Sequence, residues 1–341
     1  MGVTIKDVAR EAGTSIATVS KVLHRSYSIS KETTDKVEKV MKELNYHPNQ
    51  RARNFVSQSN KTIAFLTDID RNMGFQNPHM FEMICGMEAR LSDKGYGFLV
   101  KGLKTGDVCE YVKNAYDTKF VDGFVIHASV ISPELSKLVS VMGVPHLVVG
   151  IPEFDNDFCW IDVDNRHAGQ VAAKHLLTVG YRTVGFIGGT NEDKISMHRL
   201  EGVMSVLNEH DVFIPSNYVQ YGNSVIEDGY AMTEQMLMGD NRPEAIICAN
   251  NYLAYGCVKA LNDMKIKIPE EIGLITFDDY PFSQVLSPKL TVVNIDVYDM
   301  GQEAGSMIVQ KIRKPNLHIQ SYITYPQVIE RESTKIGKES V

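Results

Sequence analysis

Short side chains and one lysine make up a stretch near the N-terminus whose chemistry suits contact with nucleic acid. If residues 16–24 are helical, their outward face holds Ile16, Ala17, Thr18, Ser20, Lys21 and His24. Side chains this short let a helix approach base edges and phosphates closely, and alkyl groups can contact the methyl group of thymine. The alternative is a helical bundle that packs on the rest of the chain and binds nothing, but such a bundle has no need of a small, uncharged exposed face.

Three predicted helices would hold this face in place. The first starts at Thr4 and ends at Gly13, the second is capped by Ser15, and the third runs from Ser30 to Asn45. Each carries apolar residues at helical spacing, and a hydroxyl at its start can satisfy a free backbone N–H group. Because so few residues separate the first two helices, the stretch predicts a helix-turn-helix, in which the second helix reads DNA.

Charge is divided unevenly along the chain. Residues 1–60 hold ten Lys and Arg against six acidic residues, which gives +4, whereas the remaining residues carry −11 of the net charge of −7. A basic segment joined to an acidic body is typical of a polyanion-binding module attached to a domain with another task.

Composition sets the broad class. The chain has 341 residues, of which 43% are hydrophobic and 23% charged, as expected for a soluble globular protein of two or three domains. No apolar run approaches the ~18 residues of a membrane span, and no apolar signal core follows Met1, so we expect neither membrane insertion nor secretion. The five cysteines are scattered and none forms a C-x-x-C pair, which favours reduced thiols in the cytoplasm over disulfides or a metal site.

The rest of the chain alternates between strand-like and helix-like runs. Strands are predicted at Thr62–Thr67, Phe98–Val100, Gly123–His127, His146–Gly150, Thr183–Ile187, Ala245–Ala249 and Leu274–Phe277. Helices are predicted between them, for example at Pro78–Asp93, Ala168–Val179, Met197–His210 and Leu253–Met264. Repeated βα units indicate a parallel sheet with helices on both faces. The pattern occurs twice, with a break near Trp160–Asp164, and so predicts two doubly wound α/β lobes with a ligand cleft between them.

Catalytic patterns are missing from the sequence. There is no G-x-S-x-G nucleophile turn and no phosphate-binding Walker loop, and the glycines of residues 185–189 lack the G-x-G-x-x-G spacing of a dinucleotide site. Asp162 and Asp164 could form a carboxylate pair, but nothing else supports catalysis. We therefore expect a protein that is not an enzyme and that needs no cofactor.

The N-terminal motif resembles a known family. The run Thr-Ile-Lys-Asp-Val-Ala-Arg-Glu-Ala-Gly-Thr-Ser-Ile-Ala-Thr-Val-Ser-Lys-Val-Leu, residues 4–23, is similar to the headpiece of the lac repressor (LacI/GalR) family of bacterial regulators. The resemblance implies that Ile16, Ala17 and Lys21 read bases. It implies phosphate contacts for a second set, Thr4, Ser15, Thr18 and Ser20. The family usually has Arg where Lys21 stands, and lysine lacks the planar fork that reads guanine with two hydrogen bonds.

A short segment after the headpiece is a candidate hinge helix. A helix over residues 49–57 can be capped by Asn49. These residues are too few, however, to form a stable helix in water without a partner. The resemblance places this segment in the minor groove, with Phe55 as an apolar wedge between base pairs, where the family usually has Leu. Arg51 and Arg53 would serve the adjacent phosphates. The alternative is that Phe55 anchors an inert linker to the body.

The body resembles the effector domain of the same family, which has the periplasmic-binding-protein fold. The matching motifs run in order from Asn77-Pro78 through Val163-Asp164-Asn165-Arg166, Arg199-Leu-Glu-Gly202 and Phe277-Asp278-Asp279 to Arg331-Glu332-Ser333-Thr334. By this resemblance Arg199, Asn250 and Asp278 bind the effector, with His167 and Phe75 as further candidates. The alternatives are a surface ion pair for Arg199 and a turn or cap for Asp278. The family commonly has Asp where Asn251 stands, and the loop at residues 70–76 is longer than usual.

The sequence predicts a headpiece at residues 1–48, a hinge helix and linker at 49–60, and an effector-binding and dimerisation core at 61–341. The first lobe would hold about 61–161 and 292–320, and the second about 162–291 and 321–335. The expected protein is a cytoplasmic homodimeric regulator, a repressor by family resemblance, that binds a pseudo-palindromic operator under control of a sugar or sugar derivative. Tetramer-forming members of the family carry an added C-terminal helix, and only Lys335 to Val341 follow Thr334 here, so the resemblance implies a dimer. A solute-binding protein of a transporter and a sugar-modifying enzyme are the alternatives.

Overall fold

The computed structural model describes residues 3–23, 27–46, 59–69, 78–239, 241–322 and 325–334. The chain divides into a small N-terminal unit, which holds the headpiece, and a large body. Each is described by itself below.

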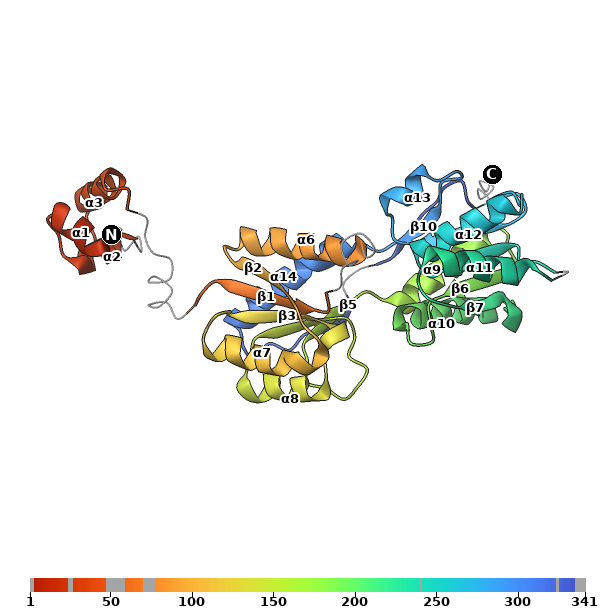
Figure 1. The fold of residues 1–341 in the computed structure, drawn as a ribbon, viewed down its shortest axis with the longest axis horizontal. Helices are drawn as coiled ribbons and strands as arrows, with labels where there is room; N and C mark the ends of the chain where they lie inside the picture. The colour runs from red at the N-terminus through yellow and green to blue at the C-terminus, as the bar shows by residue number, and fades with distance from the viewer. Residues whose placement is uncertain are drawn as a thin grey trace. The chain divides into compact units, whose positions relative to one another are not determined.

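Three helices form the headpiece: α1 (Ile5–Glu11), α2 (Ile16–Leu23) and α3 (Lys31–Glu43) (Figure 1). Their apolar faces share one small core, made by Val8, Ala9, Ala12, Val19, Val22, Val37 and Val40. Helix starts follow the capping pattern of the sequence, because the Ser15 hydroxyl accepts a hydrogen bond from Thr18 N–H at 3.1 Å and the Asp7 carboxylate accepts one from Thr4 N–H at 2.9 Å. Gly13 follows α1 with φ of +59°, a conformation that glycine adopts without strain.

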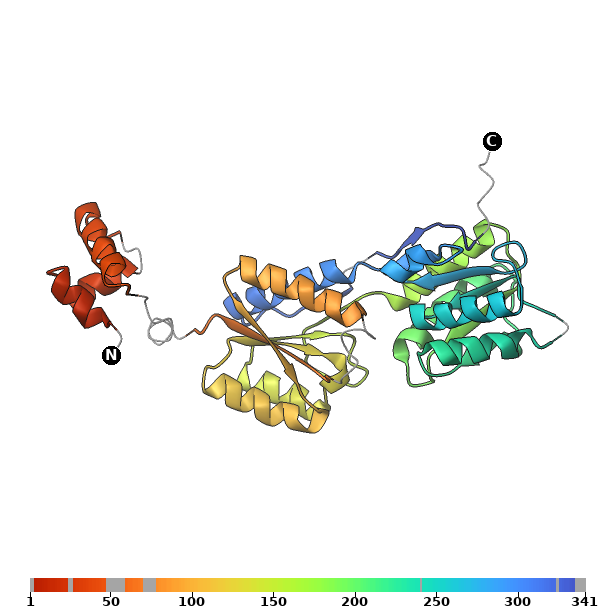
Figure 2. The ribbon, with the colours of Figure 1, turned by 45° about the horizontal axis from the view of Figure 1, so that its top comes forward.

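The first lobe of the body is built on a six-stranded sheet with the order β11-β5-β4-β3-β1-β2. Its strands are β1 (Thr62–Thr67), β2 (Gly97–Gly102), β3 (Gly123–His127), β4 (His146–Val149), β5 (Trp160–Asp162) and β11 (Gln320–Tyr322). The pairs β1–β3, β3–β4, β4–β5 and β5–β11 are parallel. On one face lie α6 (Pro78–Asp93) and α14 (Val297–Arg313), and on the other α7 (Thr105–Asp117) and α8 (Pro133–Met142) (Figures 1 and 2).

Helices α6 and α14 lie side by side because glycines let their backbones approach. Gly86 faces the carbonyl of Tyr298, and Gly301 faces the carbonyl of Met83, so closely that a side chain at either glycine would overlap the neighbouring backbone. The two helices therefore form one rigid layer over the sheet.

The second lobe repeats this plan on a sheet with the order β12-β10-β9-β8-β6-β7. Its strands are β6 (Val184–Gly188), β7 (Val219–Tyr221), β8 (Ala245–Cys248), β9 (Gly273–Phe277), β10 (Thr291–Asn294) and β12 (Gln327–Ile329). Strand β12 runs antiparallel to β10. Helices pack in two pairs, α9 (Asn165–Thr178) with α10 (Lys194–Glu209) and α11 (Ile226–Leu237) with α12 (Asn251–Asp263). The short helices of the described residues are α13 (Pro281–Val285) and the 3₁₀ helices Ala128–Val130, in the first lobe, and Ser216–Tyr218.

The chain crosses between the lobes three times. It leaves the first sheet after β5, returns after β10 and leaves again after β11. The last two crossings therefore follow residues 294 and 322, slightly beyond the expected boundaries at 292 and 321. The residues on both sides of the expected boundary at 292 are apolar and buried, so the apolar pattern of the sequence could not indicate which of the two sheets β10 would join. The predicted fold class, a helical headpiece and two doubly wound α/β lobes, is confirmed.

One buried histidine ties two strands of the first lobe together. His146 is 4% exposed, its Nε2 accepts a hydrogen bond from Cys159 N–H at 3.2 Å, and its Nδ1 lies 2.8 Å from the carbonyl of Val144. Because Nε2 is the acceptor, the ring proton is on Nδ1 and the imidazole is neutral. Burial lowers the pKa of His146 to about 4, with a smaller opposing effect of the Val144 carbonyl.

Candidate functional site

The exposed face of α2 carries the residues that the sequence singled out. Ile16 is 45% exposed although it is large and apolar, and Ala17 and Lys21 are exposed beside it. Val19 and Val22 of the same helix are buried in the headpiece core. The helix is thus held from one side and offers the other to a partner.

The four predicted phosphate-contacting residues lie around this face or at the start of α1. Thr4 and Ser15 are exposed, and Thr18 and Ser20 are half-buried. The hydroxyls of Ser15 and Thr18 are hydrogen-bonded to each other at 2.9 Å, and that of Thr4 donates to Asp7 at 2.7 Å. The hinge candidates Arg51, Arg53 and Phe55, and the effector candidate Phe75, lie outside the described residues.

A cavity of about 590 Å³ is lined by both lobes of the body. The first lobe contributes residues at the carboxyl ends of its strands, among them His127, the last residue of β3, and Asp162, the last residue of β5. The second contributes Asn165 and the start of α10, with Asp193 and His198. Ligands of parallel α/β sheets bind at the carboxyl ends of strands, and the volume is in the usual range for a small-molecule site.

Arg199 is buried in the second lobe next to Asn165, which lines the cavity. It is 2% exposed, and its guanidinium donates to Asn165 Oδ1 at 3.0 Å and to the carbonyl of Ala249 at 2.6 Å. The guanidinium carbon lies 4.1 Å from the ring centre of Phe277. These contacts fix the side chain, so the surface ion pair considered from the sequence is not its role.

Asp278 faces Arg199 and retains free capacity for hydrogen bonds. Its Oδ2 lies 3.7 Å from Nη2 of Arg199, whereas its buried Oδ1 has no hydrogen-bond partner within the described part of the chain. The same holds for the buried hydroxyl of Tyr280. Since buried polar groups are normally paired, two such groups next to a fixed arginine mark a place where a ligand can bind.

Asn251 holds the backbone that presents Asp278. Its Nδ2 donates to the carbonyls of Phe277 at 2.7 Å and Asp278 at 3.0 Å, and its Oδ1 accepts from the hydroxyl of Ser283 at 2.8 Å. Asp278 has φ of +64°, a conformation that needs such support. A carboxylate could not donate to these carbonyls, which explains an amide here where the family commonly has Asp.

None of the four described effector candidates, Arg199, Asp278, Asn250 and His167, is among the residues that line the cavity. Asn250 caps α12, since its Oδ1 accepts from Leu253 N–H at 3.1 Å and its Nδ2 donates to Ser224 at 2.9 Å. His167 lies within the first turn of α9 with Nδ1 3.1 Å from Gln170 Oε1. The structure therefore brings Arg199 and Asp278 together and leaves these two side chains in local contacts.

Sequence reasoning did not assign to the cavity several titratable residues, among them His79, His127 and Asp162, the last of which it considered only as part of a carboxylate pair. Burial lowers the pKa of His79, although the charge of Asp278 opposes the shift, and burial lowers the pKa of His127 to about 4. Burial raises the pKa of Asp162 to about 6, against hydrogen bonds from the backbone of Val163 and Ile151. The position of His127 and Asp162 at strand ends was a usable signal, whereas His79, at the start of α6, had none.

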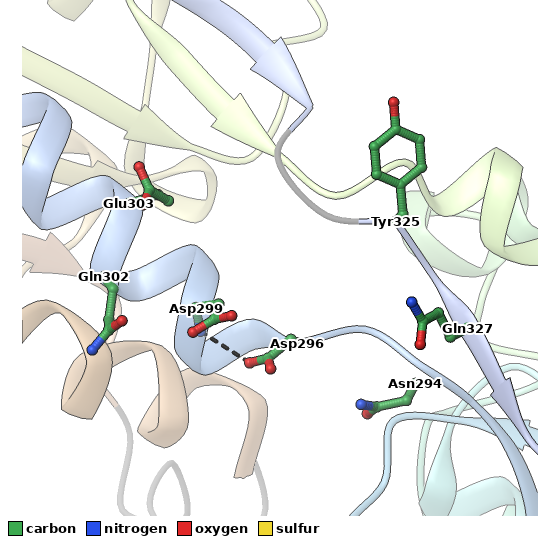
Figure 3. A pocket seen from close by; sticks show the side chains of 7 residues that line it. All are labelled: Asn294, Asp296, Asp299, Gln302, Glu303, Tyr325 and Gln327. Atoms are coloured by element: carbon green, nitrogen blue, oxygen red, sulfur yellow. Dashed lines mark hydrogen bonds between the residues drawn. The ribbon is translucent and has the colours of Figure 1, made fainter.

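A second pocket, of about 520 Å³, lies where the crossing segments run between the lobes (Figure 3). It is lined by Asn294, Asp296, Asp299, Gln302, Glu303, Tyr325 and Gln327. Asp296 Oδ1 accepts the N–H of Asp299 at 3.0 Å and so serves as the cap of α14. Among the described residues no group of three acidic, His or Cys side chains is placed to hold a metal ion, and no helix is long and apolar enough to cross a bilayer.

Comparison with known proteins agrees with both parts of the chain. Residues 4–49 match the model described as bacterial regulatory proteins, lacI family, and residues 173–334 match that of the periplasmic binding protein-like domain. The HTH-type transcriptional repressor PurR of Klebsiella pneumoniae subsp. pneumoniae is 30% identical over 340 residues, which cover 98% of this chain and 97% of that protein. The HTH-type transcriptional regulator RegA of Clostridium saccharobutylicum is 29% identical over 338 residues, or 98% of this chain and 100% of that protein.

Solved structures show the same fold. The lac repressor dimer bound to operator and the anti-inducer ONPF superposes with a TM-score of 0.83 at 21% identity, over 98% of this chain and 100% of that chain. The transcriptional regulator CelR in complex with cellobiose superposes with a TM-score of 0.71 at 23% identity, over 97% and 99% of the two chains. With its helix-turn-helix headpiece and two-lobed effector domain, the chain belongs to the lacI family of bacterial regulatory proteins and is a DNA-binding transcription regulator, not an enzyme.

Proposed function

We propose that this regulator is a cytoplasmic repressor that binds a pseudo-palindromic operator as a homodimer and releases or tightens it when a sugar or sugar derivative enters the cavity of the body. The observation that carries the DNA-binding part is the exposed α2 face of Ile16, Ala17 and Lys21 on a helix fixed by its buried valines. A two-fold dimer presents two such helices, which a palindromic site matches.

Within the headpiece, Ile16, Ala17 and Lys21 read base edges, and Thr4, Ser15, Thr18 and Ser20 contact phosphates. Thr4 lies at the start of α1, and Ser15 and Thr18 lie at the start of α2, where backbone N–H groups favour anions, whereas Ser20 lies in the middle of α2. Lysine at residue 21 supplies a single flexible ammonium, so discrimination of guanine is weaker than with arginine. In the hinge, Phe55 is the minor-groove wedge, with Arg51 and Arg53 on the flanking phosphates.

Arg199 and Asp278 bind the effector in the body, and Phe75 stays a candidate from the sequence alone. Asn250 and His167 are not part of this proposal because their side chains serve a helix cap and a contact within one helix turn. The similar structure of the transcriptional regulator CelR holds cellobiose, which supports a carbohydrate effector. The effector must bind the two lobe arrangements with different affinity if it is to change operator binding.

Selection of bound duplexes from a random pool, with the full chain and in the presence and absence of a sugar panel, tests this function. We expect a palindromic consensus whose affinity changes with one of the sugars. A Lys21→Ala change should relax one base position in each half-site, and Phe55→Ala should weaken binding markedly. Recovery of no consensus, or of an asymmetric single site, would contradict the proposal.

A further inference from the structure

The first lobe presents a donor and an acceptor to the cavity. Ser129 N–H donates to Nδ1 of His127 at 3.2 Å, so the ring proton of this neutral imidazole is on Nε2, where it can be donated. Asp162 lines the same cavity, and its carboxylate, which takes the N–H of Val163 at 2.7 Å, has about four acceptor positions. His127 pairs with Val149 and Val149 with Ile161 across neighbouring strands, so His127 and Asp162 lie at the same edge of the sheet.

The second lobe holds a further donor and acceptor, which are not among the lining residues. Arg199 is the donor and is hydrogen-bonded to the lining residue Asn165, and the acceptor is Asp278, whose buried Oδ1 has no partner within the described residues. On the cavity lining itself, His127 and Asp162 offer the pair of partners that a hydroxyl group needs, since a hydroxyl donates once and accepts as well.

Charge in the cavity is unfavourable for an anion. The described lining residues include four carboxylates, Glu153, Asp162, Glu192 and Asp193, and a single ammonium, that of Lys194. That ammonium is 3.1 Å from Glu153 Oε2 and is already paired. A phosphate would meet like charges with no unpaired lysine among the described lining residues, which raises its free energy in the cavity.

Helix starts, which bind phosphate in many α/β proteins, are occupied here by the chain's own carboxylates. Asp193 caps α10, since it accepts from Ser196 N–H at 3.3 Å and from the Ser196 hydroxyl at 2.7 Å. Asp164 caps α9 through His167 N–H at 2.8 Å. A phosphate at either helix would have to displace a carboxylate.

We propose that the cavity binds an uncharged sugar and excludes phosphorylated sugars, and that His127 and Asp162 form its hydroxyl-binding pair in the first lobe. This deepens the proposed function and rests on it, because it takes the cavity as the effector site. The apolar part of the lining, with Phe154, Met83 and Met300, suits the C–H faces of a sugar ring.

The test uses the full-length chain and matched sugar pairs: glucose with glucose 6-phosphate, ribose with ribose 5-phosphate, trehalose with trehalose 6-phosphate, and cellobiose and lactose as further uncharged probes. Thermal melting and titration calorimetry measure binding. We expect at least one uncharged sugar to bind, and its phosphorylated partner, where the panel holds one, to bind at least about tenfold more weakly. Tighter or equal binding of the phosphorylated member, or binding of none of the uncharged sugars, overturns the proposal.

Two variants then test the first-lobe pair with the sugar found. Asp162→Asn keeps the size and one acceptor, and His127→Ala removes the donor, so each should weaken binding of that sugar about tenfold or more. Asp157→Asn is the control, because this exposed carboxylate on the segment before β5 does not line the cavity. Unchanged affinity in both cavity variants refutes the assignment. Operator binding without sugar, measured on the same samples, separates this failure from a failure of the proposed function.

Discussion

Nη2 of Arg199 and Oδ2 of Asp278 are 3.7 Å apart in the interior of the second lobe, too far for a hydrogen bond although both side chains are almost fully buried. Arg199 instead donates its hydrogen bonds to Asn165 and to the carbonyl of Ala249, and Oδ1 of Asp278 has no partner in the described structure. A buried pair of this kind contributes little to stability by itself, and Oδ1 of Asp278 keeps the capacity to accept a further hydrogen bond.

Replacement of Arg199 by alanine should destabilise the body strongly. The change leaves the carboxylate of Asp278, the amide oxygen of Asn165 and the carbonyl of Ala249 buried with fewer partners, which costs about 3–5 kcal/mol in the free energy of unfolding. Urea denaturation checks this value. Arg199→Lys keeps the charge and should lose less, and a loss below ~1 kcal/mol for the alanine variant would contradict the contacts described.

Removal of the Tyr280 hydroxyl should cost the free protein almost nothing. The hydroxyl is buried in a residue that is 7% exposed and has no partner in the described structure, so Tyr280→Phe removes no hydrogen bond and should change the free energy of unfolding by less than ~0.5 kcal/mol. The same variant should bind the effector more weakly if the hydroxyl contacts it. A loss of stability above ~1 kcal/mol would show that the hydroxyl has a structural partner.

Asn251→Asp should destabilise the second lobe even though aspartate is common here in the family. The carboxylate cannot donate to the carbonyls of Phe277 and Asp278, and it would place a negative charge next to both. We expect a loss of about 2 kcal/mol in urea denaturation at pH 7.5. Asn217→Asp, on the exposed surface, is the matched control and should be near neutral.

Stability should fall when the pH is lowered from 7.5 to 5. The pKa of His146 is held at about 4 in the folded protein against 6.5 for a free side chain, so the unfolded chain binds a proton in this range and the folded protein does not. The contribution of neutral His146 to stability is complete above pH 6.5 and is lost progressively toward pH 4. At pH 5 the free energy of unfolding is lower by about 2 kcal/mol for this reason. His127, whose pKa is also lowered to about 4, adds in the same direction, whereas Asp162, whose pKa is raised to about 6, opposes it in part.

The His146→Gln variant tests the source of this pH dependence. Glutamine does not titrate and should flatten the plot of unfolding free energy against pH, whatever its effect at pH 7.5. The exposed His210→Gln change is the control and should keep the slope of the wild type. An equal slope in all three proteins would assign the effect to other groups.

Lys21→Arg should sharpen base discrimination. Arginine at this exposed place on α2 offers the planar fork that pairs with guanine O6 and N7, and a good bidentate contact discriminates by about 1–3 kcal/mol. Selected consensus sequences of the wild type and the variant would be compared at fixed salt. A consensus that is equally tolerant at every position in both proteins would place Lys21 away from the bases.

Strong apolar patterns correctly predicted the positions of the long helices and strands, but they predicted the first residues of several helices less well. The strand Gly123–His127 and the helix Pro78–Asp93 have the predicted bounds. Helices α9, α10 and α12 begin earlier than the predicted residues Ala168, Met197 and Leu253. Their first turns are polar and start at caps, Asp164, Asp193 and Asn250, which the search for apolar spacing passes over.

Three-residue strands were not predicted at all. Strands β5, β7, β11 and β12 are too short to show a period, and their pairing is decided by residues far away in the chain, as when Gln320 pairs with Trp160. The residues of the candidate site were likewise predictable only where a local sequence motif contains them. Arg199 and Asp278 belong to motifs and were singled out, whereas His79 is a single residue that only the tertiary fold brings to the cavity.

The late edge strands govern the order in which the newly made chain can become functional. The first sheet is complete only with β11 and the second only with β12, while the headpiece needs nothing beyond residue 46 of the described chain. At ~5–20 residues per second, a ribosome takes roughly 15–60 s to make the intervening stretch. During that time each nascent chain carries a folded DNA reader with neither lobe finished, and a product of premature termination would keep the reader and lack its control.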